Sequence, residues 1–321
     1  MNAPVCSVME ANCLSGMRAP SGVLTTSNLL DSREGRAIRA LKSGQLMGFK
    51  IPYDVETILK AKEDVVKANG FSDAYLRPVA WRGSEMMAVS AQHSTIHVAV
   101  AAWLWPSMFD PATKMKGIRL DIAQWKRPSP ESAPCHAKAA GLYMICTISK
   151  HKAEAEGYSD ALMLDYRGYV AELTGANVFL IRDGAIHTPT PDCFLNGLTR
   201  QTVIELARAR GFEVIERHIT PEELSTFSEC FITGSAAEVT PVSEMAGHHY
   251  KPGNITGVLA DDYSLLDANQ VHWQHLLGHR QITDSYLLGL AVRHQCCFVS
   301  FDARLNLHAV PGATAEHLIV L

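Results

Sequence analysis

The chain has 321 residues, of which 29 are basic and 33 acidic, so its formal net charge is only −4. This near balance gives no electrostatic argument for a nucleic-acid or membrane partner. The apolar fraction of 47% is ordinary for a soluble globular protein, and the length is sufficient for one large domain or two moderate ones.

The sequence contains no apolar run of membrane-spanning length and no basic-then-apolar leader at its start. The eight cysteines are scattered, with one adjacent pair, Cys296 and Cys297, and no Cys-x-x-Cys spacing. This usage is expected of small buried apolar residues in a reducing compartment, without structural zinc. We therefore expect a cytoplasmic protein.

The first part of the chain predicts an irregular lead-in followed by helices and strands. Residues 1–35 are rich in Ser, Ala, Met and Asn and show little periodicity, so we expect a poorly ordered arm. Apolar spacing near 3.6 residues predicts helices, and continuous apolar runs predict strands. The expected elements are helices over 35–49 and 55–68, strands over 74–80, 95–105 and 118–125, and a Pro-rich loop over 127–134.

The next part predicts a helix and then a meander of short strands. A helix-like run over 139–155 closes at Gly157. Turn residues such as Asp183-Gly184 separate the apolar segments that follow it. The expected elements are strands over 161–165, 169–173, 178–182 and 185–188, a helix over 199–210, and strands over 212–218, 229–233 and 238–245. Strands with interspersed helices indicate an α+β fold.

A single lysine, Lys138, lies among small residues in the stretch from Ala133 to Gly141, just before the helix over 139–155. Small neighbours allow a cofactor to approach the backbone, and semi-buried surroundings disfavour the charged form of an amine. A neutral amine forms a Schiff base with an aldehyde, which is how pyridoxal phosphate is attached to its enzymes. The alternative is an ordinary solvated lysine at a helix start.

Three separated motifs follow Lys138: the segment over 157–189, Gly197-Leu-Thr-Arg200 and Phe231-Ile-Thr-Gly-Ser-Ala-Ala-Glu-Val-Thr-Pro241. Together these motifs resemble the branched-chain aminotransferases, which are pyridoxal phosphate enzymes of fold type IV. They occur in the same order as in that family and with compatible spacing, over about residues 36–262. The resemblance implies a two-domain α+β fold in which a small α/β domain precedes a large, pseudo-barrel-like cofactor domain.

The same resemblance divides the chain into four parts. They are an atypical arm over 1–35, a small domain over 36–127, a cofactor domain over 128–265 and a foreign tail over 266–321. The family begins with two strands and a segment that closes the substrate pocket, and residues 1–35 show nothing like them. We therefore expect a truncated small domain with an unpaired sheet edge.

By resemblance, three residues carry the chemistry at the cofactor ring. Lys138 forms the Schiff base and moves the proton between the substrate Cα and the cofactor, a general acid–base task. Tyr143 matches the tyrosine that hydrogen-bonds the ring oxygen, and Glu172 matches the glutamate that pairs with the pyridine nitrogen. The alternatives are a core aromatic residue for Tyr143 and a glutamate on an exposed strand face for Glu172.

Two small-residue turns and one arginine are expected to hold the phosphate. Gly197, Leu198 and Thr199 stand at the start of a predicted helix, where free N–H groups and the helix dipole favour an anion. Thr199 is equally compatible with an ordinary N-cap. By resemblance, Gly234 and Ser235 form the second turn, and Arg39 aligns with the family's phosphate arginine.

The resemblance assigns the substrate to Tyr75, Arg77 and Ala236. Tyr75 and Arg77 match positions that meet the α-carboxylate and the acid side chain of glutamate, and a guanidinium fork suits a carboxylate. Three apolar residues, Trp103, Trp105 and Met108, are candidates for the wall of a pocket for leucine-like side chains, with generic core packing as the alternative.

After residue 265 the chain contains His279-Arg-Gln-Ile-Thr-Asp-Ser-Tyr-Leu-Leu-Gly-Leu-Ala-Val-Arg-His-Gln-Cys-Cys-Phe-Val-Ser-Phe-Asp302. This stretch resembles the C-terminal half of a PIN-domain toxin ribonuclease. In that family a helix carries an acid at the place of Asp284 and a strand ends in another at Asp302. Paired carboxylates can hold magnesium for phosphodiester cleavage. The other acids that this fold needs are absent from the sequence, so a structural appendage is the favoured interpretation and no metal site is expected.

The sequence thus predicts transamination of leucine, isoleucine or valine with 2-oxoglutarate, using pyridoxal 5′-phosphate bound at Lys138. Runner-up activities within the fold are a D-amino-acid aminotransferase and an aminodeoxychorismate lyase. From other classes, the alternatives are a metal-dependent ribonuclease fragment and an inactive fusion product. The family implies a homodimer or higher homo-oligomer with small-molecule substrates and no nucleic-acid or membrane partner.

Overall fold

The computed structural model describes residues 26–71, 74–86, 88–104, 116–253, 255–256 and 305–320, with isolated positions between 272 and 300 and with side chains from residue 34 on. The chain forms two compact units. The larger contains Leu30–Ala260 and the smaller contains Asp261–Leu321. The expected boundary near residue 265 lies close to the start of the smaller unit.

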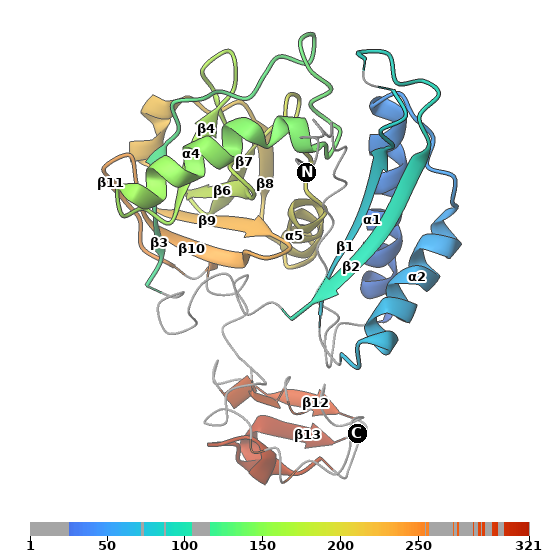
Figure 1. Cartoon of the computed structure of the whole chain (residues 1–321). Helices are drawn as coiled ribbons and strands as arrows, with labels where there is room; N and C mark the ends of the chain where they lie inside the picture. The colour runs from blue at the N-terminus through green and yellow to red at the C-terminus, as the bar shows by residue number, and fades with distance from the viewer. Residues whose placement is uncertain are drawn as a thin grey trace. The chain divides into compact units, whose positions relative to one another are not determined.

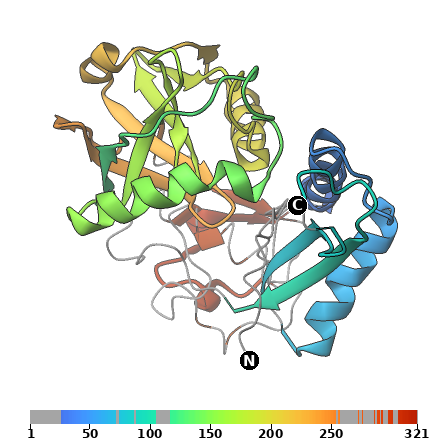
Figure 2. The ribbon, with the colours of Figure 1, turned by 45° about the horizontal axis from the view of Figure 1, so that its top comes forward.

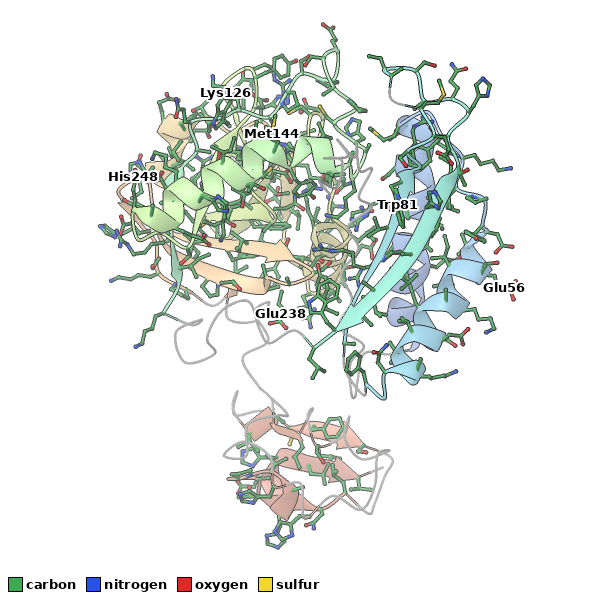
Figure 3. The ribbon with its side chains drawn as sticks, viewed as in Figure 1. Glu56, Trp81, Lys126, Met144, Glu238 and His248 are labelled. Atoms are coloured by element: carbon green, nitrogen blue, oxygen red, sulfur yellow. The ribbon has the colours of Figure 1, made fainter. Side chains whose placement is uncertain are left out.

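The first part of the larger unit is a two-stranded sheet covered by two helices (Figure 1). Strand β1 (Tyr75–Arg82) pairs antiparallel with β2 (Ile96–Trp103). Helix α2 (Val55–Ala68) begins where the Asp54 side chain accepts a hydrogen bond from the Thr57 N–H at 2.8 Å, as an N-cap does. Its apolar side packs on the sheet, and Glu56 projects from its exposed side (Figure 3).

Helix α1 (Thr26–Leu46) begins earlier than expected. Its first turns are rich in polar residues and contain Gly35, so their spacing gives little helical signal. Residues 26–35 therefore belong to a helix and not to an irregular arm, whereas residues 1–25 lie outside the described part of the chain. Ala37 and Leu41 of α1 pack with Phe49 and Ile58 in the core beneath the sheet.

The second part of the larger unit is one large sheet, in the order β5-β4-β3-β10-β9-β6-β7-β8, with β11 (His248–His249) paired to β10. Pairing is mixed: β3 is parallel to both β4 and β10, and β7 is parallel to β8. Its strands are β3 (Ile118–Ile122), β4 (Asp160–Leu164), β5 (Val170–Leu173), β6 (Asn177–Arg182), β7 (Ala185–Pro189), β8 (Val214–Arg217), β9 (Glu229–Gly234) and β10 (Glu238–Met245).

The expected meander is only partly correct. The β4–β5 and β6–β7 pairs are antiparallel neighbours, and Asp183 and Gly184 both have positive φ in the two-residue turn between β6 and β7. However, β5 and β6 stand apart in the sheet order, because β6 pairs with β9. Local periodicity predicts strands but carries no information on pairing with a segment about fifty residues later.

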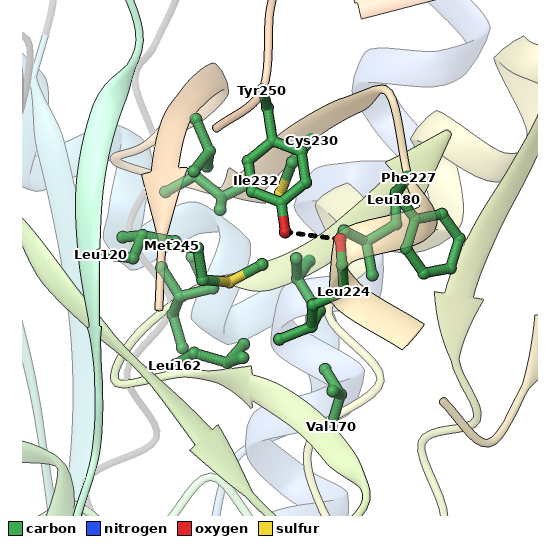
Figure 4. Packing of buried hydrophobic residues seen from close by; sticks show 14 of the residues in the cluster. Leu120, Leu162, Val170, Leu180, Leu224, Phe227, Cys230, Ile232, Met245 and Tyr250 are labelled. Carbon is green, nitrogen blue, oxygen red and sulfur yellow. Dashed lines mark hydrogen bonds between the residues drawn. The ribbon is translucent and has the colours of Figure 1, made fainter. Parts of the chain in front are cut away.

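The large sheet has an apolar core on both faces, so its strands are continuous apolar runs. Alternate residues point to opposite sides. Leu120, Leu162 and Leu180 enter the inner core with Ile232, Met245 and Tyr250, whose hydroxyl donates to the Leu224 carbonyl at 3.0 Å (Figure 4). Their strand neighbours Phe179, Ile181 and Phe231 face the other side.

Two helices cover the outer faces of the large sheet (Figure 2). Helix α5 (Leu198–Ala209) places Val203, Ile204 and Ala207 against Phe179 and Phe231. Helix α4 (Met144–Ala155), preceded by the 3₁₀ turn η1 (Ala140–Leu142), packs Cys146 and Ala153 against Ala161 and Met163 of β4. The α+β expectation is confirmed by this arrangement.

One further 3₁₀ helix, η2 (Pro221–Thr226), was not expected, although its signal is in the sequence. Thr220 and Glu223 form a capping box, and Pro221 occupies the first helical position.

Between Gly117 and β10 the backbones approach closely: a Cβ at Gly117 would lie 2.7 Å from the Ser243 nitrogen, and its φ of +82° also favours glycine.

The smaller unit contains strands β12 (Phe298–Ser300) and β13 (Leu318–Val320), which pair in parallel, and the 3₁₀ turns η5 (Leu307–Ala309) and η6 (Ala315–His317). Leu288, Leu305 and Val310 form its core. The two acids of the expected ribonuclease-like site, Asp284 and Asp302, lie outside the described residues. Among the helices that the structure describes, none has the length and apolarity of a membrane span.

Candidate active site

The Lys138 side chain ends beside a tyrosine hydroxyl. Lys138 lies in the loop just before η1, between the buried Ala137 and Ala139, and its Nζ donates to the Tyr143 Oη at 2.8 Å. Its backbone N–H donates to the Ser43 Oγ of helix α1 at 3.0 Å. The lysine is therefore half-buried and held from both the backbone and the amine, unlike a solvated lysine at a helix start.

Tyr143 has the environment of a neutral hydrogen-bonding phenol. Burial raises its pKa above the ordinary value, and the nearby Glu172 carboxylate and Cys146 thiol raise it further. The ring also packs with the core under α4, so the core-aromatic alternative is correct for the ring while the hydroxyl reaches the lysine. Such a phenol donates or accepts a hydrogen bond without ionising near neutral pH.

Glu172 is buried on β5, where all four strand residues are buried, so the exposed-face alternative is wrong. Its Oε1 lies 3.2 Å from the Arg127 Nε, and its Oε2 accepts a hydrogen bond from the Asn177 Nδ2 at 3.3 Å. Burial raises the Glu172 pKa to about 7, against the opposing attraction of Arg127 and Lys138. The site thus holds a carboxylate that can be either charged or neutral near physiological pH.

The other end of the site is the start of helix α5. Gly197, not Thr199, occupies the N-cap position, and no side chain caps it, so the alternative of Thr199 as a simple N-cap is wrong. A Cβ at Gly197 would lie 2.2 Å from the Asn177 Oδ1, so only glycine fits there without a shift. The free amides of the first turn are suited to an anion.

One pocket brings these groups together. It is lined by every residue that the sequence assigned to catalysis or to the cofactor, namely Arg39, Lys138, Tyr143, Glu172, Gly197, Leu198, Thr199, Gly234 and Ser235. These residues come from α1, the lysine loop, the junction of η1 and α4, β5, the start of α5, and the end of β9 with the turn that follows it. The sequence motifs therefore converge on one place.

Seven further residues line the same pocket, and no sequence motif had marked them as site residues. They are Arg127, Thr174, Gly175, Ala176, Asn177, Leu195 and Thr233. Thr174 to Asn177 form the turn that the sequence predicted, but a turn signal alone does not indicate what the turn faces. In the sequence, Arg127 is only a lone arginine at the start of the Pro-rich loop, and nothing beside it marks it as a site residue.

The three predicted substrate residues do not line this pocket. Tyr75 and Arg77 lie on β1, opposite Trp103 and Ala101 of β2. The Tyr75 and Trp103 ring centroids are 5.0 Å apart, and the Arg77 Cζ lies 5.3 Å from the Trp103 centroid. Ala236 lies in the β9–β10 turn after Ser235, and Trp105 and Met108 fall outside the described residues.

Arg36 of α1, which no sequence motif had marked, interacts electrostatically with residues of both regions. Burial and the neighbouring Arg39 lower the Arg36 pKa to about 10, and Tyr75 opposes that shift. Arg36 therefore lies near both Arg39, which lines the pocket, and Tyr75 on β1. Two neighbouring guanidinium groups give this end of the pocket a positive potential.

Elsewhere in the part of the chain that the structure describes, one cluster has ligand atoms close enough for a metal ion: Asp165, Asp192 and Cys193. Arg167 Nη2 approaches the two carboxylates at 2.6 and 2.8 Å, and His218 Nε2 lies 3.0 Å from Asp192. These carboxylates serve an ion-pair network, which accounts for their proximity without a metal.

The curled mixed sheet and its pocket place the protein in a known class of transferases. Residues 38–245 match the family described as amino-transferase class IV, and the chain belongs to that family. Within that family, the chain is similar to branched-chain-amino-acid aminotransferases. A probable branched-chain-amino-acid aminotransferase of Rickettsia conorii is 40% identical over 229 residues, covering 71% of this chain and 76% of the relative. The branched-chain-amino-acid aminotransferase of Pseudomonas aeruginosa is 35% identical over 240 residues, covering 72% and 78%.

Solved structures of branched-chain aminotransferases share the fold. The enzyme of Thermoproteus uzoniensis with norvaline gives a TM-score of 0.68 at 36% identity and covers 71% of this chain and 76% of that one. The Escherichia coli enzyme gives the same TM-score of 0.68 at 30% identity, with the same coverage. Another structure of this kind was solved with pyridoxamine 5′-phosphate. The expected fold type IV architecture is confirmed by these matches, whereas the expected division of residues 36–265 into a small and a large domain stays a prediction.

Proposed function

We propose that this chain is a pyridoxal 5′-phosphate-dependent transaminase that moves the amino group of leucine, isoleucine or valine to 2-oxoglutarate. The observation that carries the proposal is the Lys138 amine 2.8 Å from the Tyr143 hydroxyl, in a pocket that also contains a buried glutamate and an uncapped helix start. The branched-chain relatives at 35–40% identity support the choice of substrate.

The residues of the pocket fit this cofactor. The amides at the start of α5, the Gly234–Ser235 turn and Arg39 would hold the phosphate. Glu172 would meet the pyridine nitrogen, Tyr143 the ring oxygen, and Lys138 the carbonyl carbon. Glycine at position 197 lets the start of α5 lie close to Asn177, since a Cβ there would come within 2.2 Å of the Asn177 Oδ1. Thr233 Oγ1 is buried in the pocket wall and has no hydrogen-bond partner within the described residues.

The bound cofactor supplies an electrophilic carbonyl for the amino group and a ring that withdraws electrons from the substrate Cα. Lys138 Nζ removes the proton from the Cα of the amino donor. In the second half of the reaction it gives a proton to the Cα of the amino acceptor, so it acts as a general acid–base catalyst. Tyr143 holds the amine in position through its hydroxyl. Glu172, as an anion, keeps a proton on the nitrogen that it faces.

For the substrate, the proposal assigns the α-carboxylate and the second carboxylate of glutamate to Tyr75 and Arg77. The Arg77 Nε is buried and has no hydrogen-bond partner among the described residues, and Trp103 stacks beside the guanidinium. A buried guanidinium nitrogen of this kind is suited to bind an incoming carboxylate. Ala236 would contribute its backbone N–H from the turn beside Ser235.

The experiment is a titration of the purified protein with pyridoxal phosphate, followed by its visible absorbance, before and after addition of leucine. Lys138→Ala is the test variant. Lys67→Ala is the matched control, because Lys67 on α2 is 75% exposed. We expect an absorbance band in the wild type and in the control that leucine bleaches, and no such band in Lys138→Ala.

A band that forms but does not respond to leucine would mean an intact cofactor site with a different or incomplete substrate pocket. Response to D-alanine or to aminodeoxychorismate in place of leucine would identify the runner-up activities. No band in the wild type would refute the enzyme hypothesis for this chain and favour the inactive alternative.

The proposal includes the remaining expectations on assembly, location and tail. We propose a homo-oligomer, at least a dimer, in the cytoplasm, where the five described cysteines, all free thiols, would stay reduced. The ribonuclease-like interpretation of residues 266–321 stays a prediction. Magnesium-dependent RNA cleavage that is lost in Asp302→Asn would support it, and sedimentation at micromolar concentration would test the oligomer.

A further inference from the structure

Arg127 is a buried cation that the proposed chemistry does not use. It is 2% exposed and belongs to the largest fully buried side chains of the protein. Its backbone N–H donates to the Leu164 carbonyl at 2.8 Å, which fixes the residue at the end of β4. A guanidinium at such a place is strongly destabilising unless an anion and hydrogen-bond acceptors compensate it.

The anion is Glu172. The Arg127 Nε lies 3.2 Å from Glu172 Oε1, with exposed side-chain fractions of 2% for the arginine and 10% for the glutamate. Arg127 is also the largest of the attractive contributions that oppose the burial-driven rise of the Glu172 pKa. This neighbouring cation favours the charged form of the carboxylate inside the protein.

The same guanidinium binds the segment that carries Tyr143. The Arg127 Nη1 donates to the Leu142 carbonyl at 3.2 Å and to the Cys146 Sγ at 3.1 Å. Leu142 directly precedes Tyr143, and Cys146 lies one turn further along α4. One side chain therefore fixes the distance between Glu172 and the segment that carries the Tyr143 hydroxyl.

The surroundings of Glu172 leave Arg127 as its principal cation. Asn177 donates to the other carboxylate oxygen at 3.3 Å and carries no charge. Lys138 attracts the carboxylate less than Arg127 does, and its amine would be bonded to the cofactor when the cofactor is present. Within the described residues, the charged and titratable groups that face Glu172 are Arg127, Lys138, Tyr143, Cys135 and Cys146.

We propose that Arg127 is a positioning residue that keeps Glu172 ionised and aimed into the pocket, and that it ties this carboxylate to the Tyr143 segment. The inference deepens the proposed function and rests on it for the identity of the ligand that Glu172 meets. The Arg127–Glu172 coupling itself can be measured without any ligand.

The test uses Arg127→Met, which keeps the volume but removes the charge, and Arg127→Lys, which keeps the charge but removes the fork. Both are made in the wild type and in a Glu172→Gln background, so that coupling is separated from general damage. The control is Arg119→Met, because Arg119 forms a surface pair with Glu244 at 2.7 Å on β3 and β10. Urea unfolding against pH and cofactor titration by absorbance are the two readouts.

In the cofactor-free protein, the stability difference between the wild type and Glu172→Gln reports the ionisation of Glu172. We expect Arg127→Met to raise the folded pKa of Glu172, so the upper end of that pH dependence should move to higher pH. In Arg127→Lys the displacement should be smaller, because the positive charge is kept. If Arg127→Met does not fold, the displacement seen with Arg127→Lys decides the question. An unchanged pH dependence in the folded variants would overturn the proposal.

In the cofactor titration, we expect Arg127→Met to weaken pyridoxal phosphate binding roughly tenfold, the factor that corresponds to a change of one unit in the Glu172 pKa. This loss should occur when residue 172 is glutamate and not when it is glutamine. Equal weakening in the Glu172→Gln background would mean a merely structural role and would also overturn the proposal. If the wild type binds no pyridoxal phosphate but the Arg127 variants show the pH displacement, the proposed function is rejected and the Arg127–Glu172 coupling stands.

Discussion

The larger unit contains two regions that differ in how firmly they hold their functional side chains. In the region of the large sheet, β5 and β7 are buried along their whole length. In the β1–β2 region, β2 alternates between half-buried and exposed residues, since helices cover one face only. The proposed cofactor residues belong mainly to the first region and the proposed substrate residues Tyr75 and Arg77 to the second.

We infer from this difference that the proposed cofactor residues and the proposed substrate residues can be altered separately. A side chain between two apolar layers has few alternative rotamers, and any change there disturbs packing. A side chain on the uncovered face of a two-stranded sheet can change with little effect on its surroundings. Substitutions in the two regions should therefore give different kinds of defect.

The largest effect is expected at Lys138. Lys138→Ala should lower the transamination kcat by about a thousandfold, because it removes the proton carrier. The thermal midpoint should change little, since the truncated residue keeps the hydrogen bond from its backbone N–H to the Ser43 Oγ. Stopped-flow absorbance with leucine measures the rate. A loss no greater than in Lys67→Ala would refute the role of the lysine.

The pH dependence of stability should report Glu172. Burial raises its folded pKa to about 7, from the ordinary value of 4.5. Between these pH values the folded state keeps a proton that the unfolded state has lost, so the stability of the wild type falls relative to Glu172→Gln as pH rises. The loss should total about 3 kcal/mol and level off above pH 7. Urea titrations of the cofactor-free proteins measure it, and a constant difference would contradict it.

Gly197→Ala should damage the anion end of the pocket. Its Cβ would lie 2.2 Å from the Asn177 Oδ1, which must shift and release Glu172. We expect a destabilisation of about 1–3 kcal/mol, as overpacking typically gives, and weaker pyridoxal phosphate binding. Gly141→Ala is the control, because nothing lies within 4 Å of a Cβ there. Equal behaviour of the two variants would argue against the close approach.

The smallest effect should come from the β1–β2 region. Trp103→Ala removes the ring beside Arg77, so the KM for 2-oxoglutarate should rise about two- to fivefold, as expected for one cation–π contact. Cofactor affinity should stay at the wild-type value. Trp81→Ala is the control, since Trp81 stacks on His97 further along the same pair of strands. A change in cofactor affinity would remove the distinction between the regions.

The sequence predicted much of this molecule, and the misses have a common cause. Helix α2 has the expected bounds, and the turn at Asp183-Gly184 has the expected conformation. The pairing of β6 with β9 was missed, as were the pocket positions of Arg127 and Asn177 and the half-buried neighbour Arg36. Each of these depends on segments far apart in the chain, and local spacing carries no information on them. Glu172 was found only because a motif surrounds it.

The hydrogen bond from the Lys138 N–H to the Ser43 Oγ joins residues 95 positions apart, and the pocket draws on residues from Arg39 to Ser235. Contacts of such large sequence separation form slowly, because long loops must close before they are gained. The pocket should therefore be completed late in refolding, after the transition state. Pyridoxal phosphate added to a refolding mixture should leave the refolding rate unchanged and slow only the unfolding of the finished protein.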